Sequence, residues 1–193
     1  MMTTQAQLGD NTYTLERFPL DQKNRSLQAW DSGDEYLVNY VQEHHPDANS
    51  VLILNDSFGA LACAFSSLTV YSVNDSYIGH QATRYNLKAN ELTIDSVKQL
   101  HSLQALPSQV DLVILKVPRN LGYLQHQLAA ISAALPKDIA VIAAGKTKDI
   151  HNSTIKAFNQ YIGDTSTSLA VKKSRLVISK TSGFDKKAPF PVS

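Results

Sequence analysis

The sequence predicts an α/β fold, a doubly wound, mostly parallel seven-stranded sheet that ends in an antiparallel hairpin. Short apolar runs alternate five times with segments of helical periodicity, which is the pattern of a parallel sheet with helices on both faces. Two strand-like segments then follow each other closely, which favours an antiparallel pair at one edge. A length of 193 residues is enough for one such domain with a buried core.

The predicted strands are short apolar runs rich in branched residues, as is typical of buried parallel strands. A first, separate strand is expected at 13–18. The strands of the sheet are expected at 51–54, 70–73, 97–100, 112–115 and 139–144, and the closing pair at 168–171 and 176–178. In the closing pair, apolar residues alternate with polar or small ones, which predicts half-buried strands: Leu169, Val171, Leu176 and Ile178.

Helices are predicted where apolar residues recur at three- and four-residue spacing. The first begins after Asp31-Ser32 and stops before Pro46, because a residue that precedes proline avoids the α region. The others are expected at 60–65, 76–90, 121–135 and 154–161. Their expected buried residues are Ile78, Ala82, Tyr85 and Leu87 in the helix at 76–90, and Leu124, Leu128, Ile131 and Leu135 in the helix at 121–135.

One domain is expected at 13–182, between a flexible leader at 1–12 and a linker at 183–193. The leader is polar and has no hydrophobic period, and the tail contains Pro189 and Pro191. The tail predicts a further domain in a longer protein.

Composition excludes several classes of protein. Hydrophobic residues make up 43% of the chain and charged residues 18%, too apolar a balance for disorder. No apolar run reaches the roughly 20 residues that cross a bilayer, and no secretory signal precedes the domain. The single cysteine, Cys63, cannot form an internal disulfide, which fits a reducing compartment. We therefore expect a soluble, cytoplasmic protein.

A doubly wound sheet binds its ligands beyond the carboxyl ends of its strands. The loop after the first strand of the sheet has one glycine, Gly59, where a nucleotide cofactor needs several, and Phe58 adds a large ring. This loop fits an ordinary turn or the remnant of a pocket. Asp75 either faces that pocket or caps the next helix. We expect no cofactor in this vestigial cleft, which comprises Asn55, Asp56, Ser57, Gly59, Asn74 and Asp75.

No residue stands out as catalytic. The cations Lys116 and Arg119 follow the strand at 112–115, where they suit a phosphate or a solvated loop but not a general base. The histidines show no metal-ligating spacing, so no metal site is expected. Cys63 lies in an apolar helix and fits a core residue better than a nucleophile.

Positive charge is concentrated in the last quarter of the chain. Residues 1–145 hold 9 Lys and Arg against 14 Asp and Glu, whereas residues 146–193 hold 9 against 3. This asymmetry favours a polyanionic partner, because bound phosphates release counterions, or it reflects solvated lysines. Lys146 and Lys148 follow a strand that ends at the same sheet edge as Lys116 and Arg119, so one patch is expected there. The sequence leaves open at which edge the turn of the closing hairpin lies.

Short motifs in a fixed order cover nearly the whole chain. They lie at 27–31, 34–37, 51–60 (VLILNDSFGA), 75–78, 82–84, 86–87, 116–118, 149–151, 153–154, 172–173 and 175–176. In these motifs the chain resembles the amino-terminal domain of the ribosomal RNA guanine-N2 methyltransferases, most closely the large-subunit (23S) enzymes. The resemblance implies a class I methyltransferase-like, Rossmann-like fold. It also implies a second domain that binds S-adenosylmethionine and carries an Asn-Pro-Pro-Phe motif.

The chain departs from that pattern at three places. Lys116-Val117-Pro118-Arg119 stands where the family has Asn-Pro-Pro-Phe, Gly59 is alone in its loop, and Asn74 stands at the position of the second-strand acid. The resemblance therefore implies no catalytic residue and no cofactor in this degenerate domain. S-adenosylmethionine would belong to the full-length protein, a transferase, whose catalytic domain lies outside this chain.

The expected function is that of a non-catalytic amino-terminal domain of a 23S rRNA guanine-N2 methyltransferase, which helps to bind or position rRNA. Its partners would be rRNA and its own carboxyl-terminal catalytic domain, with no membrane and no DNA. Candidate RNA-binding residues are Lys116, Arg119, Lys146, Lys148, Lys172, Lys173 and Arg175. One alternative is a purely structural domain that supports the catalytic half. A second is an atypical methyltransferase active on its own, with a site of Asp56, Ser57, Asp75 and Lys116.

Overall fold

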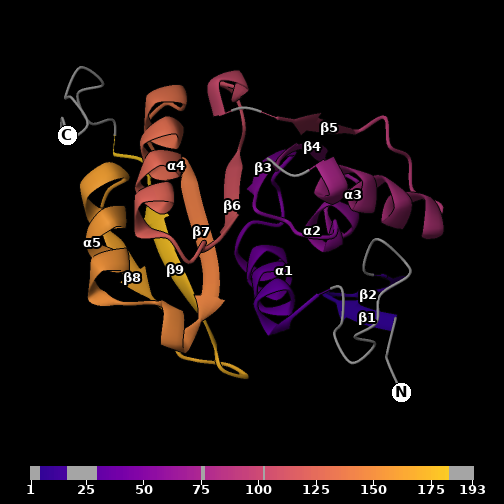
Figure 1. The fold of residues 1–193 in the computed structure, drawn as a ribbon, viewed down its shortest axis with the longest axis horizontal. Coiled ribbons are helices and arrows are strands. Elements are labelled where there is room, and N and C mark those ends of the chain that lie inside the picture. The colour runs from indigo at the N-terminus through magenta and orange to yellow at the C-terminus, as the bar shows by residue number, and fades with distance from the viewer. Residues whose placement is uncertain (1–4, 17–29, 75–76, 102, 183–193) are drawn as a thin grey trace.

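A seven-stranded sheet forms the centre of the computed structural model, which describes residues 5–16, 30–74, 77–101 and 103–182. The strand order is β5-β4-β3-β6-β7-β9-β8 (Figure 1). Five strands are parallel: β3 (Ser50–Leu54), β4 (Thr69–Val73), β5 (Val97–Leu100), β6 (Leu112–Lys116) and β7 (Ala140–Lys146). The antiparallel β9 (Ser174–Lys180) lies between β7 and β8 (Thr165–Thr167). This architecture confirms the predicted fold class.

The apolar runs of the sequence become strands that are buried on both faces. In β3, Val51 and Ile53 point into one core, and Leu52 and Leu54 point into the other. All four are fully buried. A continuous apolar run is therefore required here, because alternate residues of one strand serve opposite faces of the sheet.

Helices cover both faces of the sheet (Figure 1). The first core is covered by α1 (Ser32–His44), α2 (Ala60–Ala64) and α3 (Tyr77–Ala89), and the second by α4 (Leu121–Ala134) and α5 (Asn152–Tyr161). Two short 3₁₀ helices, η1 (Leu103–Ala105) and η2 (Thr147–Asp149), lie in loops. The predicted helices are confirmed. The predicted buried residues of α4, and Leu135 directly after it, are also confirmed: Leu124, Leu128, Ile131 and Leu135. No helix in the described ranges is apolar and long enough to span a membrane.

The predicted buried side of α3 is wrong in part. Ala82 and Leu87 are buried, but Ile78 is 48% exposed and Tyr85 is half-buried. A buried asparagine, Asn86, faces the protein instead. Its Nδ2 donates to the carbonyl oxygens of Glu16 (2.9 Å) and Phe58 (2.8 Å). Because these two backbone carbonyl groups of the same chain face α3, this side of the helix is more polar than the spacing of its apolar residues suggested.

The predicted leader at 1–12 is wrong for residues 5–12. The strands β1 (Gln5–Leu8) and β2 (Asn11–Thr14) pair as a hairpin whose turn contains Gly9 at a positive φ of 63°. Exposed and buried residues alternate along β1, which is the pattern of a strand with one face on the core. The strand expected at 13–18 is confirmed only at its start, where β2 ends at Thr14, and residues 17–18 lie outside the described ranges.

The closing hairpin is antiparallel as predicted, but its first strand is misplaced. That strand, β8, lies at Thr165–Thr167, and residues 168–173 form the connection to β9. Leu169 is 85% exposed and Val171 is 46% exposed, so the prediction that both are half-buried is wrong. The reason is the tight turn at Lys172 and Lys173, which have positive φ angles of 50° and 67°. Leu176 is buried and Ile178 is half-buried. The predicted linker at 183–193 lies outside the described residues.

Candidate functional site

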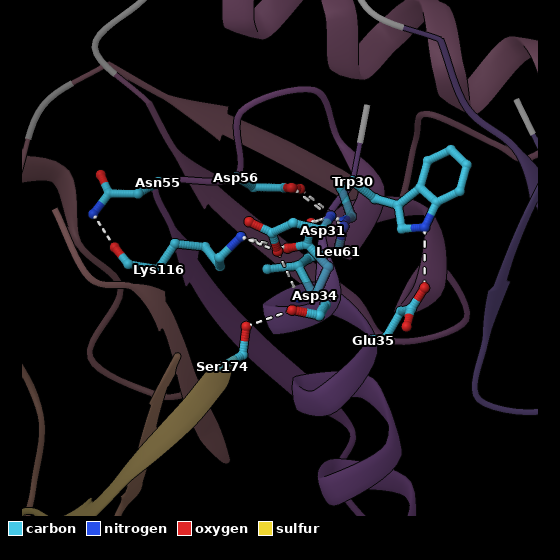
Figure 2. A network of polar contacts seen from close by, with 11 residues as sticks. Trp30, Asp31, Asp34, Glu35, Asn55, Asp56, Leu61, Lys116 and Ser174 are labelled. Atoms are coloured by element: carbon cyan, nitrogen blue, oxygen red, sulfur yellow. Dashed lines mark hydrogen bonds and ion pairs between the residues drawn. The ribbon is translucent and has the colours of Figure 1, made fainter. Parts of the chain in front are cut away.

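The strand order reverses between β3 and β6, which places the candidate site at the carboxyl ends of these two strands. Lys116 is the last residue of β6, and Asn55 and Asp56 follow β3 directly. The amino-terminal end of α1 lies over the same edge and brings Asp31 and Asp34 to Lys116 (Figure 2).

The ammonium group of Lys116 forms two ion pairs inside the protein. Its Nζ lies 3.0 Å from Oδ1 of Asp31 and 2.9 Å from Oδ1 of Asp34. The same two carboxylates form a reciprocal cap of α1, since each accepts from the other's backbone N–H at 3.0 Å. Helix capping and ion pairing therefore fasten α1 to the end of β6.

Burial and shared charge set the protonation of this group. Burial raises the pKa of Asp34 to about 7; the Lys116 ammonium opposes that shift, and the carboxylates of Asp31 and Asp56 add to it. For Asp31, burial is the largest single effect and acts upward, but the Lys116 charge together with the hydrogen bonds from Lys116 and from the backbone N–H groups of Asp34 and Gly33 holds its pKa below the ordinary value. Burial acts to lower the pKa of Lys116, and its two carboxylate partners raise it above the ordinary range. One cation serves several carboxylates, so the buried carboxyl of Asp34 keeps its proton to a higher pH than the more exposed Asp31.

Asp56 occupies the start of α2. Its carboxylate accepts from the backbone N–H groups of Leu61 (3.2 Å) and Ala62 (2.9 Å), and the residue is 2% exposed. Burial raises the pKa of Asp56, although these hydrogen bonds oppose the shift. These backbone N–H groups, which a polar ligand at this helix end would need, are thus bound by the protein's own side chain.

Gly59 is explained by helix packing. It has a φ of 90°, and a Cβ placed on it would lie 2.6 Å from the Cα of Thr83 in α3. Both its backbone conformation and the close approach of α3 exclude a side chain. The glycine is therefore required by the fold whether or not a ligand approaches it.

The two asparagines of the predicted cleft connect strand ends. Asn55 donates from Nδ2 to the carbonyl of Lys116 (2.9 Å), and it exchanges two amide hydrogen bonds of 3.0 Å with the buried Gln127 of α4. Asn74 donates to the carbonyl oxygen of Asp56 (3.2 Å). Asp75, the remaining acid predicted here, lies outside the described residues.

The cavity that the described residues form at this edge is small. A cavity of about 110 Å³ is lined by Trp30, Asp31, Asp34, Asp56, Ser57, Phe58 and Lys116. Sites for drug-sized ligands and cofactors usually measure about 300–1,000 Å³. Trp30, one of the lining residues, is 7% exposed and donates from Nε1 to Glu35 (3.2 Å). The geometry is that of a packed polar network rather than an open ligand site.

The patch predicted from Lys116, Arg119, Lys146 and Lys148 forms only in part. The side chain of Lys116 is 19% exposed and is engaged by two carboxylates, so the prediction that it contacts RNA does not fit the structure. The sequence identified Asp31 only as a helix cap and missed Asp34 and Gln127. The Asp-x-x-Asp spacing at the start of α1 signalled the cap, but no local signal pointed to Lys116.

The structure decides where the hairpin turn lies. Lys146 at the end of β7 is opposite Ser174, and Thr147 N–H donates to the carbonyl of Lys173 (2.9 Å). The turn therefore lies at the carboxyl edge of β7, beside Lys146 and Lys148. We call these four exposed residues the basic edge: Lys146, Lys148, Lys172 and Lys173. Lys172 also lies 3.6 Å from Glu35.

The other residues that the sequence singled out lie outside both the Lys116 network and the basic edge. Arg119 is exposed in the loop after β6, and Arg175 is half-buried in β9. Burial raises the pKa of the fully buried Cys63 thiol, in keeping with a core residue. No group of His, Cys, Asp or Glu side chains that fits a metal ion is found in the described part of the chain.

The family model and the relatives of similar sequence point to the same kind of protein. The model of a family described as the RLMG N-terminal domain matches residues 3–183. Ribosomal RNA large subunit methyltransferase G of Pseudoalteromonas translucida (strain TAC 125) is 68% identical over 194 residues, which cover 100% of this chain and 51% of that protein. The corresponding protein of Colwellia psychrerythraea is 43% identical, with 95% and 49% covered. The chain thus spans about half the length of the curated relatives it matches.

Solved structures of methyltransferases share the fold. The T. thermophilus 16S rRNA N2 G1207 methyltransferase, in complex with AdoMet and guanosine, superposes with a TM-score of 0.70 at 17% identity. That match covers 92% of this chain and 49% of the other. The ribosomal protein L11 methylase of Lactobacillus delbrueckii subsp. bulgaricus gives a TM-score of 0.69 at 12% identity, covering 93% and 100%.

Proposed function

Because the chain belongs to the family of RLMG N-terminal domains, we propose that it is the non-catalytic domain of an S-adenosylmethionine-dependent 23S rRNA guanine-N2 methyltransferase, where it helps to bind or position rRNA. Relatives named as large-subunit rRNA methyltransferases are about twice as long as this chain. The catalytic half, which would bind S-adenosylmethionine, then corresponds to the part of those relatives that this chain does not cover. The cytoplasm is the compartment that such a role requires.

One observation supports this proposal: the protein's own side chains bind the polar groups at the carboxyl ends of β3 and β6, the edge at which a doubly wound sheet binds its ligands. Asp56 takes the N–H groups at the start of α2, and Asp31 and Asp34 neutralise the cation that ends β6. The cavity of about 110 Å³ that the described residues leave there is smaller than the usual site of a molecule the size of S-adenosylmethionine. Lys116, which stands in the place of the asparagine of the family motif, has its ammonium group engaged by these two carboxylates.

Calorimetric titration of the chain with S-adenosylmethionine tests the non-catalytic role. We expect no binding with a Kd of about 10 µM or tighter, which corresponds to about 7 kcal/mol. The control is a full-length relative that contains the second domain, which is expected to bind under the same conditions. Binding by the chain alone at that affinity would favour the alternative of an atypical methyltransferase.

The basic edge supports a role in RNA binding. Four exposed lysines, from the end of β7, the helix η2 and the turn before β9, lie at the carboxyl edge of the sheet. Lysine contacts to phosphates hold an RNA in place without reading its sequence, which suits a domain that assists a separate catalytic domain. The competing proposal, a purely structural domain, predicts that these lysines leave RNA affinity unchanged.

A further inference from the structure

A second and larger hollow lies away from the candidate site, between α3 and the edge strand β5, which are neighbours in Figure 1. Its volume is about 700 Å³, within the usual range of ligand sites. We call it the α3–β5 groove. It shares no lining residue with the Lys116 network and contains none of the lysines of the basic edge.

The groove has a cationic wall on α3. His80, Arg84 and Lys88 follow each other at intervals of four residues, so they lie along one face of the helix and all line the groove. Arg84 and Lys88 are exposed. Within the described residues, neither of these two side chains forms an ion pair. Their attachment points are about 6 Å apart along the helix axis, a separation that one nucleotide of an extended strand spans.

The opposite wall is one face of β5. Val97 and Gln99 of β5 and His101, which directly follows it, alternate along the chain and line the groove, whereas Lys98 points to the other face. His101 meets His80 across the groove with ring centroids 4.2 Å apart and planes inclined at 57°. Aromatic rings of this kind accept the face of an unpaired base.

The floor of the groove is apolar and the rim is basic. Leu87 and Val97 are buried beneath it, with exposed fractions of 1% and 9%, and Ile94 is half-buried. Its lining includes one carboxylate, Asp95, and two cations, Arg84 and Lys88. An apolar floor with a cationic rim complements a molecule that has flat apolar faces and regularly spaced negative charges.

We propose that the α3–β5 groove binds an unpaired, single-stranded segment of RNA. Phosphates would contact Arg84 and Lys88, and a base would lie against the floor and His101. A base-paired helix does not present base faces in this way, so the groove favours single strands. This inference rests on the proposed function, because it adds a second RNA contact to that of the basic edge.

The test is fluorescence anisotropy of the whole chain with a labelled single-stranded RNA of about 10 nucleotides, within the range of known single-strand sites. The variant is Arg84→Gln with Lys88→Gln. The charge-matched control is Lys98→Gln with Lys137→Gln, two exposed lysines that do not line the groove. Thermal melting checks that each variant stays folded.

We expect the groove variant to bind about tenfold more weakly, and the slope of log affinity against log salt to fall by about 1.4, since each lost contact removes about 0.7 on a single strand. The control keeps the wild-type affinity and slope. In addition, 4-thiouridine in the RNA is expected to cross-link to α3 or β5 in the wild-type chain and not in the groove variant.

The other outcomes separate the two proposals. If the wild-type chain binds RNA and the groove variant binds equally well, the groove proposal is overturned and the RNA-binding role stands. A control that loses as much affinity as the groove variant also overturns it, because general charge then explains the effect. If the groove variant keeps its RNA affinity but loses association with the catalytic domain, the groove belongs to a protein partner. A wild-type chain without RNA affinity overturns both proposals.

Discussion

At the scale of single residues, the Lys116 ammonium is the centre of the candidate site. It contacts Asp31 and Asp34, and the carboxyl of Asp56 lies within electrostatic range of both Lys116 and Asp34. The three acids outnumber their cation, which explains why one buried carboxyl resists ionisation while a more exposed one ionises readily. The arrangement therefore predicts a pH dependence of stability.

Replacing Asp34 with Asn is expected to reveal that dependence. The pKa of Asp34 is about 7 in the folded protein and near 3.8 when unfolded, so between these values only the folded state holds the proton. The unfolding free energy of the wild type, relative to Asp34→Asn, should therefore fall as pH rises from 4 to 7, on the order of 3 kcal/mol, and then level off. Urea denaturation at a series of pH values measures this difference.

The control is Asp31→Asn, for which the sign reverses. The pKa of Asp31 is lowered by folding, so its contribution to stability is present above its unfolded pKa and is lost as pH falls. If the wild type and Asp34→Asn gave parallel curves of stability against pH, the assignment of a raised pKa to Asp34 would be wrong.

Substitution of Gly59 tests the packing of α2 against α3. We expect Gly59→Ala to destabilise the protein by about 3 kcal/mol, because it combines an unfavourable backbone conformation with a contact at 2.6 Å to Thr83. The variant Gly59→Asn separates the two causes, since asparagine tolerates positive φ better than alanine. Similar losses in both variants, measured by thermal denaturation, indicate that the contact dominates. A much milder loss for Asn would assign the effect to backbone strain instead.

At the scale of elements, β9 holds the end of the sheet together. It pairs with β7 over seven residue pairs, from Ala140–Lys180 to Lys146–Ser174, and with β8 on its other side. Its buried residues contribute to both cores, Leu176 to one and Val177 to the other. The hairpin is therefore part of the sheet and not an appendage.

Truncation tests the role of this hairpin. Deleting residues 168–193 removes β9, exposes the edge of β7 and uncovers both cores, so we expect the cooperative thermal transition to be lost. Deleting only 183–193, the predicted linker, is expected to preserve the transition. A sharp transition in the longer deletion would show that β9 is dispensable for the fold.

At the scale of the whole molecule, charge is divided between the two ends of the strands. The basic edge lies at the carboxyl ends, while Lys137 and Lys180 lie at the opposite edge, before β7 and at the end of β9. Lys137 and Lys180 are exposed like the lysines of the basic edge, so they provide a control pair for mutagenesis.

Reversing two charges of the basic edge tests its contact with RNA. We expect Lys146→Glu with Lys148→Glu to weaken RNA binding for all sequences and to reduce the salt slope by about one unit per lost contact. Lys137→Glu with Lys180→Glu carries the same change of charge at the other edge and is expected to have little effect. Filter binding at several salt concentrations distinguishes the two variants. Equal affinities of the wild type and the Lys146/Lys148 variant would favour the purely structural domain.

Much of the fold was predictable from the sequence because its signals are local. A run such as Val51–Leu54 is apolar throughout because both faces of β3 are buried, and the periodicity of α4 shows directly in its leucines. Local signals failed where a short segment depended on a distant partner. The hairpin of β1 and β2 is one case, since its Thr14 is hydrogen-bonded through backbone N–H and C=O to Asn90, 76 residues away.

The sequence by itself determined the order of the strands and helices of the main sheet, the sheet edge at which a site must lie and the presence of a single glycine in the loop after β3. Tertiary structure alone decided what the charged residues there do. Lys116 meets acids 82 and 85 residues earlier in the chain, and the turn at Lys172–Lys173 reaches the edge of Lys146 only through the register of β9. The physical reason is that apolar periodicity records burial residue by residue. An ion pair depends instead on which distant segments the folded sheet brings within contact distance.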